Sequence, residues 1–349
     1  MSETLPPTDV PPAPSGSENL PPVEQPSAGF IVQLFVIPGL IVLVIVLLWL
    51  GFSWLAHQGT RPEQLVRQMR QNKANSWQLA YNFSEELRQN ETYRRNQALA
   101  EEVATFLDDL LDQPLPPRSG DSLGGTNPRS QEIARRGFLC KALGEFLIPQ
   151  TVLPVLIRAA SAVADEDELR VQLAALEAIA LLTENTRPEQ TSISPKLLAM
   201  LLAASEKMDR KIVSRAVVGL TATRQKKATD RLVQMLQEPH HVDVQYNVAT
   251  GLARLGNPEC VETLEEMLNP ATVRGLTEEV NQSARQLKRL RILLNAVRAT
   301  RLLAEKNPQV NIDRLRLAIE RLLASEKNVQ IRVEAEATLQ ALARRARSS

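Results

Sequence analysis

The residue types that most often bind metals or attack substrates are scarce in this chain of 349 residues. It has three histidines and two cysteines, which are His57, His240, His241, Cys140 and Cys260. His240 and His241 are adjacent and follow a proline, so they cannot readily chelate one ion together, and no cluster of acids and histidines surrounds them. We therefore expect both to be exposed turn residues, and we expect no metal ion and no other cofactor.

The two cysteines are far apart in the sequence, and each lies in an apolar helical pattern. This is typical of small core residues in a reducing compartment. A nucleophilic cysteine needs a nearby histidine or the positive end of a helix, and neither is evident beside Cys140 or Cys260. The chain also lacks a nucleophile elbow, a Gly-rich phosphate loop and a paired-cysteine motif. We therefore expect that it is not an enzyme.

A helix-forming stretch near the C-terminus carries a dense group of positive charges. The segment SARQLKRLRILLNAVRATR, residues 283–301, contains no acid. Its six basic residues are the candidate partner-binding residues Arg285, Lys288, Arg289, Arg291, Arg298 and Arg301. On a helical projection its leucines gather on one side, and most of the basic side chains lie opposite them.

Two interpretations of this basic stretch remain open. It is either an ordinary solvated face balanced by acidic neighbours or a patch that binds an acidic protein segment or anionic lipid headgroups. Nucleic acid is not expected as a partner, because no aromatic residues for base stacking are interleaved with the basic ones. The whole chain is also nearly neutral, with 41 Lys and Arg against 40 Asp and Glu.

An uncharged apolar run precedes the charged part of the chain. Residues 34–55 would reach about 33 Å as a helix, enough for a hydrocarbon core of about 30 Å. No Lys or Arg occurs in residues 1–60, whereas four basic residues follow within residues 61–73. The length of this run predicts a transmembrane helix over residues 30–56 of a single-pass protein of the inner or plasma membrane. By the positive-inside rule, its N-terminus would lie outside and its C-terminal part in the cytoplasm.

Two segments lack the pattern of a folded element. Residues 1–29 hold eight of the 22 prolines together with four acids and no base, so we expect a disordered tail. Residues 113–130 have no apolar periodicity, and we expect a flexible loop there. The remaining sequence divides into one or two helical pairs over residues 61–112 and a solenoid over residues 131–346.

The long C-terminal part shows pairs of amphipathic stretches separated by short polar breaks. Apolar residues recur four apart in three of them, at Ile212, Ala216 and Leu220, at Val244, Val248 and Leu252, and at Ile331, Ala335 and Leu339. Looser copies begin at Ile133 with Gly137 and at Leu169 with Leu173. Self-similarity at a period of about 30–45 residues predicts an all-α solenoid.

Two local expectations follow from this pattern. Small residues at the middle position, such as Ala216, Ala335 and Gly137, should let two helices approach closely. Residues 270–305 have no clean repeat register, and we expect one long helix from about Glu278 to Lys306.

The clearest copy is HHVDVQYNVATGLARLGNPECVETLEEML, residues 240–268. It resembles the short bacterial HEAT-like repeat of the PBS-lyase type, an armadillo-like fold. Asp243 opens the first helix, Ala249 and Leu252 follow, and the turn Leu-Gly-Asn-Pro-Glu leads into the second helix. Gln245 replaces the usual arginine. The resemblance extends more weakly over residues 61–346 and implies a fold of HEAT-like helix pairs, not an activity.

Taken together, these patterns predict a HEAT-repeat scaffold or adaptor that binds protein partners at the cytoplasmic face of a membrane. The alternative is a membrane-tethered HEAT-fold enzyme or accessory factor, lyase-like or chaperone-like, because bilin lyases also contain such repeats. If the basic stretch is not the binding surface, we expect the concave surface, lined by the second helices of the pairs, to serve instead.

Overall fold

The chain folds into two compact units, Met1–Thr60 and Arg61–Ser349, and every regular element described is a helix. The computed structural model describes residues 29, 37–56, 62–71, 76–118, 127–161, 167–186 and 194–348, with the backbone alone for 53–56 and 346–348. The predicted disordered tail therefore lies outside the described residues, apart from residue 29.

The first unit contributes one long helix, α2 (Ile37–Ala56), which has no charged residue and whose described side chains are exposed. Within the residues that the structure describes, no helix is both long enough and apolar enough to cross a membrane. The predicted single-pass localisation, with the solenoid in the cytoplasm, is therefore wrong. The apolar run that prompted it spans residues 34–55, whereas α2 begins at Ile37 and the described side chains of this helix end at Phe52.

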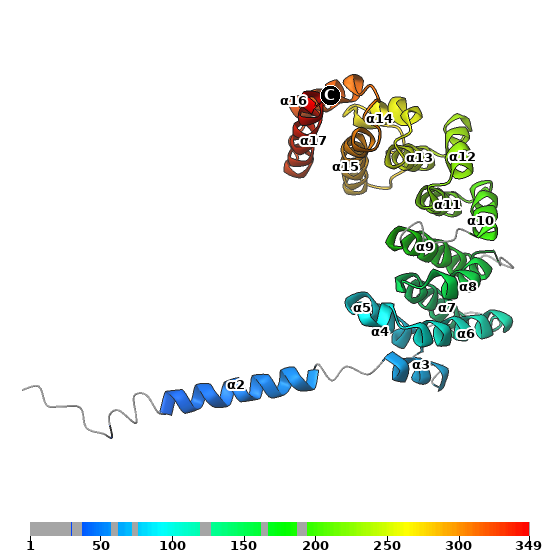
Figure 1. Ribbon diagram of the computed structural model, residues 1–349, viewed down its shortest axis with the longest axis vertical. Helices are drawn as coiled ribbons and strands as arrows, with labels where there is room; N and C mark the ends of the chain where they lie inside the picture. Colours follow the sequence, from blue (N-terminus) through cyan, green and yellow to red (C-terminus); the bar gives the residue numbers. More distant parts are fainter. Residues whose placement is uncertain are drawn as a thin grey trace, which may run out of the picture. The chain divides into compact units, whose positions relative to one another are not determined.

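The helices of the second unit alternate between two layers (Figure 1). The inner layer consists of α4 (Ser76–Gln89), α7 (Pro128–Glu145), α9 (Leu169–Asn185), α11 (Arg210–Thr223), α13 (Val242–Arg254), α15 (Gln282–Lys306) and α17 (Val329–Ser348). The outer layer consists of α6 (Gln97–Asp112), α8 (Pro149–Ser161), α10 (Pro195–Ser205), α12 (Lys226–Gln237), α14 (Val261–Leu268) and α16 (Asp313–Ser325). Helix α3 (Pro62–Gln71) packs on α4 and α6, and the short α5 (Glu91–Arg94) follows α4.

Consecutive inner helices contact one another more extensively than consecutive outer helices do. The inner helices accordingly lie along the inside of the bend that the second unit follows in Figure 1. The second helix of each predicted pair belongs to the outer layer, so the expectation that second helices line the concave surface is wrong. The all-helical repeat solenoid itself is confirmed.

The repeated apolar positions lie in or against the core, as predicted. They are Ile212, Ala216, Leu220, Val244, Val248, Leu252, Ile331, Ala335 and Leu339. In α9, however, Leu169 and Leu173 are only partly buried, and Val171, Ala175 and Ile179 occupy the core positions. The sequence of α9 is rich in Leu and Ala on every side, so its periodicity did not distinguish the two registers.

A close approach between inner helices occurs at Gly144 of α7. A Cβ atom at this position would lie 2.7 Å from the Cα atom of Ala178 in α9. At Gly137, where the close approach was predicted, a Cβ atom would lie 3.8 Å from the Cβ atom of Ala174, which is an ordinary contact. The two helices therefore meet more tightly near the C-terminal end of α7 than in its middle.

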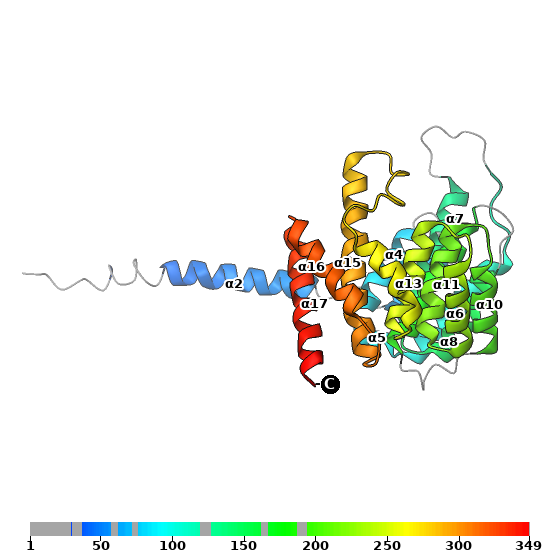
Figure 2. The same ribbon diagram turned by 90° about the horizontal axis from the view of Figure 1, so that it is seen from above.

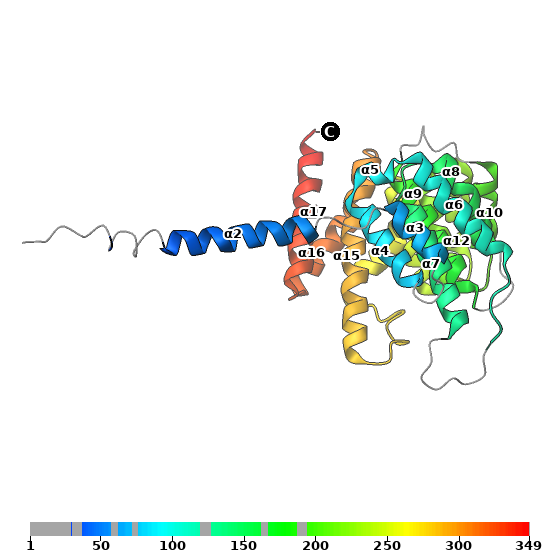
Figure 3. The same ribbon diagram turned by 90° about the horizontal axis from the view of Figure 1, so that it is seen from below.

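Side-chain caps fix the ends of several helices. The predicted long helix is α15, which ends at Lys306 as expected and begins at Gln282, because the side chain of Asn281 accepts a hydrogen bond from the amide of Ala284. Figures 2 and 3 show that its first turns extend beyond the neighbouring helices. The predicted turn after α13 is present, with Gly256 at a φ of 75° and Asn257 capping the short helix η2 (Pro258–Cys260).

The predicted loop at residues 113–130 is described only at its two ends, and α7 already begins at Pro128. Both ends are anchored. Arg136 donates to the carbonyl oxygen of Gln113 at 2.8 Å, and Arg129 donates to the carbonyl oxygen of Pro116 at 2.8 Å.

Candidate functional site

The six basic residues proposed from the sequence all lie on α15, but they do not form one free surface. Lys288 lies between two carboxylates, with Nζ 3.0 Å from Oδ1 of Asp243 and 3.1 Å from Oε1 of Glu279. Burial alone would lower the pKa of Lys288, but hydrogen bonds to both carboxylates outweigh that effect and raise the pKa above its ordinary value. Lys288 therefore fastens α15 to α13.

Three further basic residues connect α15 to α17 and to the turn that precedes it. Arg289 lies 2.8 Å from Oε2 of Glu326, which is 6% exposed and precedes α17. Arg298 and Arg301 both approach Glu334 of α17, at 3.1 and 3.3 Å. These ion pairs join neighbouring helices, so the charges they use are largely neutralised within the chain.

Arg285 and Arg291 have no carboxylate partner in the part of the chain that the structure describes. Arg285 donates from Nε to the carbonyl oxygen of Glu279 at 3.2 Å. Arg291 is exposed and makes no hydrogen bond or ion pair among the described residues. Of the predicted site, Arg291 is thus the cation with its full bonding capacity available.

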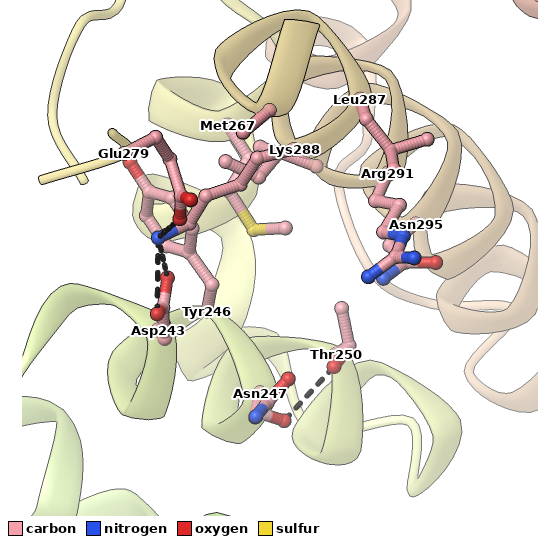
Figure 4. Close-up of a pocket in the computed structure, with 12 residues that line it drawn as sticks. Asp243, Tyr246, Asn247, Thr250, Met267, Glu279, Leu287, Lys288, Arg291 and Asn295 are labelled. Carbon is pink, nitrogen blue, oxygen red and sulfur yellow. Dashed lines mark hydrogen bonds and ion pairs between the residues drawn. The ribbon is translucent and has the colours of Figure 1, made fainter. Parts of the chain in front are cut away.

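Arg291 projects into a groove of about 410 Å³ between α13 and α15 (Figure 4). We call this the α13–α15 groove. Helix α13 contributes Asn247 and Thr250 to its lining, and α15 contributes Asn295 and Leu287, which is 51% exposed. The side-chain amides of Asn247 and Asn295 have no partner among the described residues, so both can donate and accept.

Ion pairs hold the segment between α14 and α15, which borders the groove. Nε2 of His241 lies 2.7 Å from Oε2 of Glu278, and Arg210 of α11 lies 3.2 Å from the same oxygen. The hydrogen bond from His241 lowers the pKa of the Glu278 carboxyl below its ordinary value. Arg274 of the same segment pairs with Glu266 of α14 at 3.0 Å. The walls of the groove are therefore fixed before any ligand arrives.

Tyr246 and Met267 close the deep side of the groove. The Tyr246 hydroxyl donates to Oε1 of Glu266 at 2.8 Å. Burial, together with this contact to a carboxylate, raises the pKa of Tyr246 well above its ordinary value. Tyr246 therefore stays a neutral hydrogen-bond donor, and its ring forms an apolar wall.

The histidines are more involved than the sequence indicated. The side chains of His240 and His241 are 18% and 23% exposed and form hydrogen bonds to carboxylates, so they are partly buried and not simple exposed turn residues. Nε2 of His240 lies 2.9 Å from Glu238. Among the described residues no three His, Cys, Asp or Glu side chains are placed to hold a metal ion. His57 lies outside the described residues.

Both cysteines are buried, as predicted. Burial raises the pKa of Cys140 and of Cys260 to about 12. A thiol in that state is a poor nucleophile near neutral pH. The cysteines belong to the core.

The sequence pointed to α15 but missed the groove residues on both helices. Asn247 and Asn295 each directly precede a fully buried residue, Val248 and Ala296. The signal in the sequence was an uncharged polar residue directly before a core position, repeated on the two successive inner helices α13 and α15.

Residues 194–284 match the family model for HEAT repeats. This stretch runs from the cap of α10 into the first turn of α15, so it contains α13 and the segment that borders the groove. The resemblance seen at residues 240–268 is thereby confirmed over a longer part of the chain. A comparison with curated proteins gave no match.

Solved structures of helical-repeat proteins are similar to this chain at low identity. A designed armadillo repeat protein, YIII(Dq)4CqI, is 18% identical with a TM-score of 0.40 and covers 69% of this chain and 99% of its own. The complex of CpcE and CpcF of phycocyanin lyase from Nostoc sp. PCC7120 is 18% identical with a TM-score of 0.39. The match covers 81% of this chain and 95% of that structure's chain.

Proposed function

We propose that this chain is a non-enzymatic scaffold that holds an extended, acidic segment of a protein partner in the α13–α15 groove. One observation carries the proposal. Arg291 lies in a preformed groove beside the side-chain amides of Asn247 and Asn295, and none of the three side chains has a partner among the described residues. HEAT-type repeats of the kind found at residues 194–284 supply the rigid helices on which such a groove depends.

The chemistry of the groove suits a peptide. A guanidinium group binds a carboxylate with two parallel hydrogen bonds. A side-chain amide can donate to a backbone carbonyl and accept from a backbone N–H, which is what an extended segment offers. Leu287 and Met267 add an apolar wall for a neighbouring side chain. A volume of about 410 Å³ is enough for a few side chains and not for a folded domain.

Binding in the groove also requires little additional ordering of its side chains. Lys288 is held by Asp243 and Glu279, and Glu278 is held by His241, so binding need not order these walls. Association loses less free energy when fewer side chains must be immobilised.

The charge distribution favours a protein segment over lipid headgroups or nucleic acid. Four of the six candidate basic residues are already paired with acids of this chain, which leaves two of the six without a carboxylate partner among the described residues. A polyanionic surface is bound by many free cations acting together. Of these two, only Arg291 lines the groove, and one guanidinium group fits the recognition of a single carboxylate. The buried, high-pKa cysteines support binding and not covalent catalysis.

The proposal can be tested with the full-length chain and short labelled peptides that carry one acidic residue between apolar residues. By fluorescence anisotropy, Arg291→Gln should weaken binding by about tenfold, the effect of losing one charge-assisted contact. Arg285→Gln, on the same helix and outside the groove, is the matched control and should bind normally. Peptides with Asn in place of Asp should bind wild type as weakly as Asp peptides bind Arg291→Gln.

Equal affinities for Arg291→Gln and wild type would refute the proposal. Incubation with a panel of cofactors and pigments separates it from the enzymatic alternative. A stable covalent product in that panel would favour a lyase-like activity.

A further inference from the structure

A second surface, far from the α13–α15 groove along the array, is formed by one exposed and two half-buried aromatic side chains. We define the aromatic patch as Trp77 and Tyr81 of α4 with Phe138 and Lys141 of α7. The rings of Trp77 and Phe138 are stacked, with centroids 6.4 Å apart and planes at 23°. Tyr81 meets Phe138 edge-on, with centroids 5.5 Å apart. Nζ of Lys141 lies 5.6 Å from the centre of the Phe138 ring.

The patch is partly exposed, through Tyr81 and Lys141, in a chain that has few aromatic residues. Phe, Trp and Tyr make up 4% of the sequence, and Tyr81 is 47% exposed while Trp77 and Phe138 are half-buried. No hydrogen bond to the Tyr81 hydroxyl or the Trp77 indole N–H is present among the described residues. Tyr and Trp normally pair these groups when they pack into a core, and they are enriched in binding hot spots. Here both polar groups remain available to a ligand.

The chemistry of the patch selects one kind of ligand. Adjacent aromatic rings that reach the surface bind proline-rich segments, whose extended helix is already ordered before binding. Lys141 makes no ion pair within the described part of the chain and adds a preference for acidic residues near the prolines. The same Lys141 disfavours a cationic ligand, which the aromatic faces alone would also attract.

One segment of this chain is both proline-rich and acidic, as such a ligand should be. Residues 1–29 contain eight prolines, three pairs of them adjacent, with four acids and no Lys or Arg. We propose that the aromatic patch binds the proline-rich segment, residues 1–29, of a second copy of this chain. Each of two copies offers one patch and one segment, so reciprocal exchange closes a symmetric pair. This proposal rests on different residues from the groove and stands independently of it.

The test uses photocrosslinking between isotopically distinct copies of the full chain. A photoreactive residue replaces Ser15, and unlabelled protein is mixed with ¹⁵N-labelled protein before irradiation. Mass spectrometry then identifies the crosslinked peptides and their isotope composition. We expect crosslinks from position 15 to peptides of α4 or α7, with mixed-isotope pairs among them.

Two sets of variants make the test specific. Tyr81→Ala and Lys141→Glu change exposed side chains, so the helical circular dichroism signal should be unchanged while the mixed-isotope crosslink falls by about tenfold or more. Lys211→Glu, an exposed lysine of α11, is the matched charge control and should crosslink normally. Replacing the prolines of residues 1–29 with alanine removes the ligand chemistry without touching the patch, and it should abolish the crosslink.

Three results would overturn the proposal. Crosslinks that map away from α4 and α7 would place the segment elsewhere. Crosslinks that contain only one isotope would mean that no second copy is involved. Crosslinks that survive both Tyr81→Ala and the proline replacements would show that aromatic–proline contact is not the cause.

Discussion

Adding one methyl group at Gly144 should destabilise the solenoid, because it would collide with the backbone of α9. The ideal Cβ position lies 2.7 Å from the Cα atom and 3.0 Å from the carbonyl oxygen of Ala178. Overpacking costs about 1–3 kcal/mol, and a clash with backbone belongs near the upper end because backbone cannot rotate away. Ala is favoured over Gly within a helix by about 1 kcal/mol, so the net loss for Gly144→Ala is about 2 kcal/mol.

Gly137→Ala is the matched control on the same helix. Its new Cβ atom would meet the Cβ atom of Ala174 at 3.8 Å, without a clash, so the gain in helix propensity of about 1 kcal/mol is kept. Thermal unfolding of the full chain, followed by circular dichroism, should therefore move in opposite directions for the two variants. If Gly144→Ala melts at or above the wild-type temperature, the argument from the spacing between α7 and α9 is refuted.

Further substitutions probe the core and its ion pairs. Ala216→Leu, at a fully buried position, should cost about 1–3 kcal/mol in urea unfolding, and an unchanged midpoint would mean that Ala216 is not a helix contact. Arg289→Met should destabilise the chain because it leaves Glu326 buried and unpaired, and adding Glu326→Gln should recover part of the loss. Burial raises the pKa of Glu326, but hydrogen bonds from backbone N–H groups and Arg289 outweigh it and lower the pKa below its ordinary value. The stability from Glu326 is thus present above the unfolded-state pKa and lost as pH falls through the folded-state pKa, so Glu326→Gln should flatten the drop in Tm below about pH 4.5. Because burial raises the pKa of Cys140 and Cys260 to about 12, neither should react with a thiol reagent at about pH 8 until the chain unfolds.

The sequence was sufficient to predict the repeat architecture, because its signal is local. Apolar residues four apart on α11, α13 and α17 lie in or against the core, and α15 ends where predicted. The signal failed in α9, where leucines and alanines surround the helix and two registers look equally apolar. The membrane prediction rested on the length of the uncharged run at residues 34–55, and among the described residues no helix has both the length and the apolar character needed to cross a membrane.

The candidate site could be predicted only in part, because its character depends on residues distant in the sequence. The acids that neutralise α15 come from other elements: Asp243 lies on α13, and Glu326 and Glu334 lie before and on α17. Inspection of residues 283–301 alone shows only basic charge. Arg291 stands out only after those pairings are known, and the groove beside it becomes visible only when α13 is placed against α15.

The ion pairs on both sides of α15 set the order in which this end of the array comes apart. A linear array opens from its ends, because a terminal repeat has only one neighbour. Helices α16 and α17 can detach once their packing on α14 and α15 is lost and Glu326 and Glu334 are released by the arginines of α15, and the groove still keeps both of its walls. The groove disappears only in a second opening, when Lys288 separates from Asp243. Amide hydrogen exchange should accordingly be faster in α17 than in α15, and a bound segment would slow the second opening while leaving the first almost unchanged.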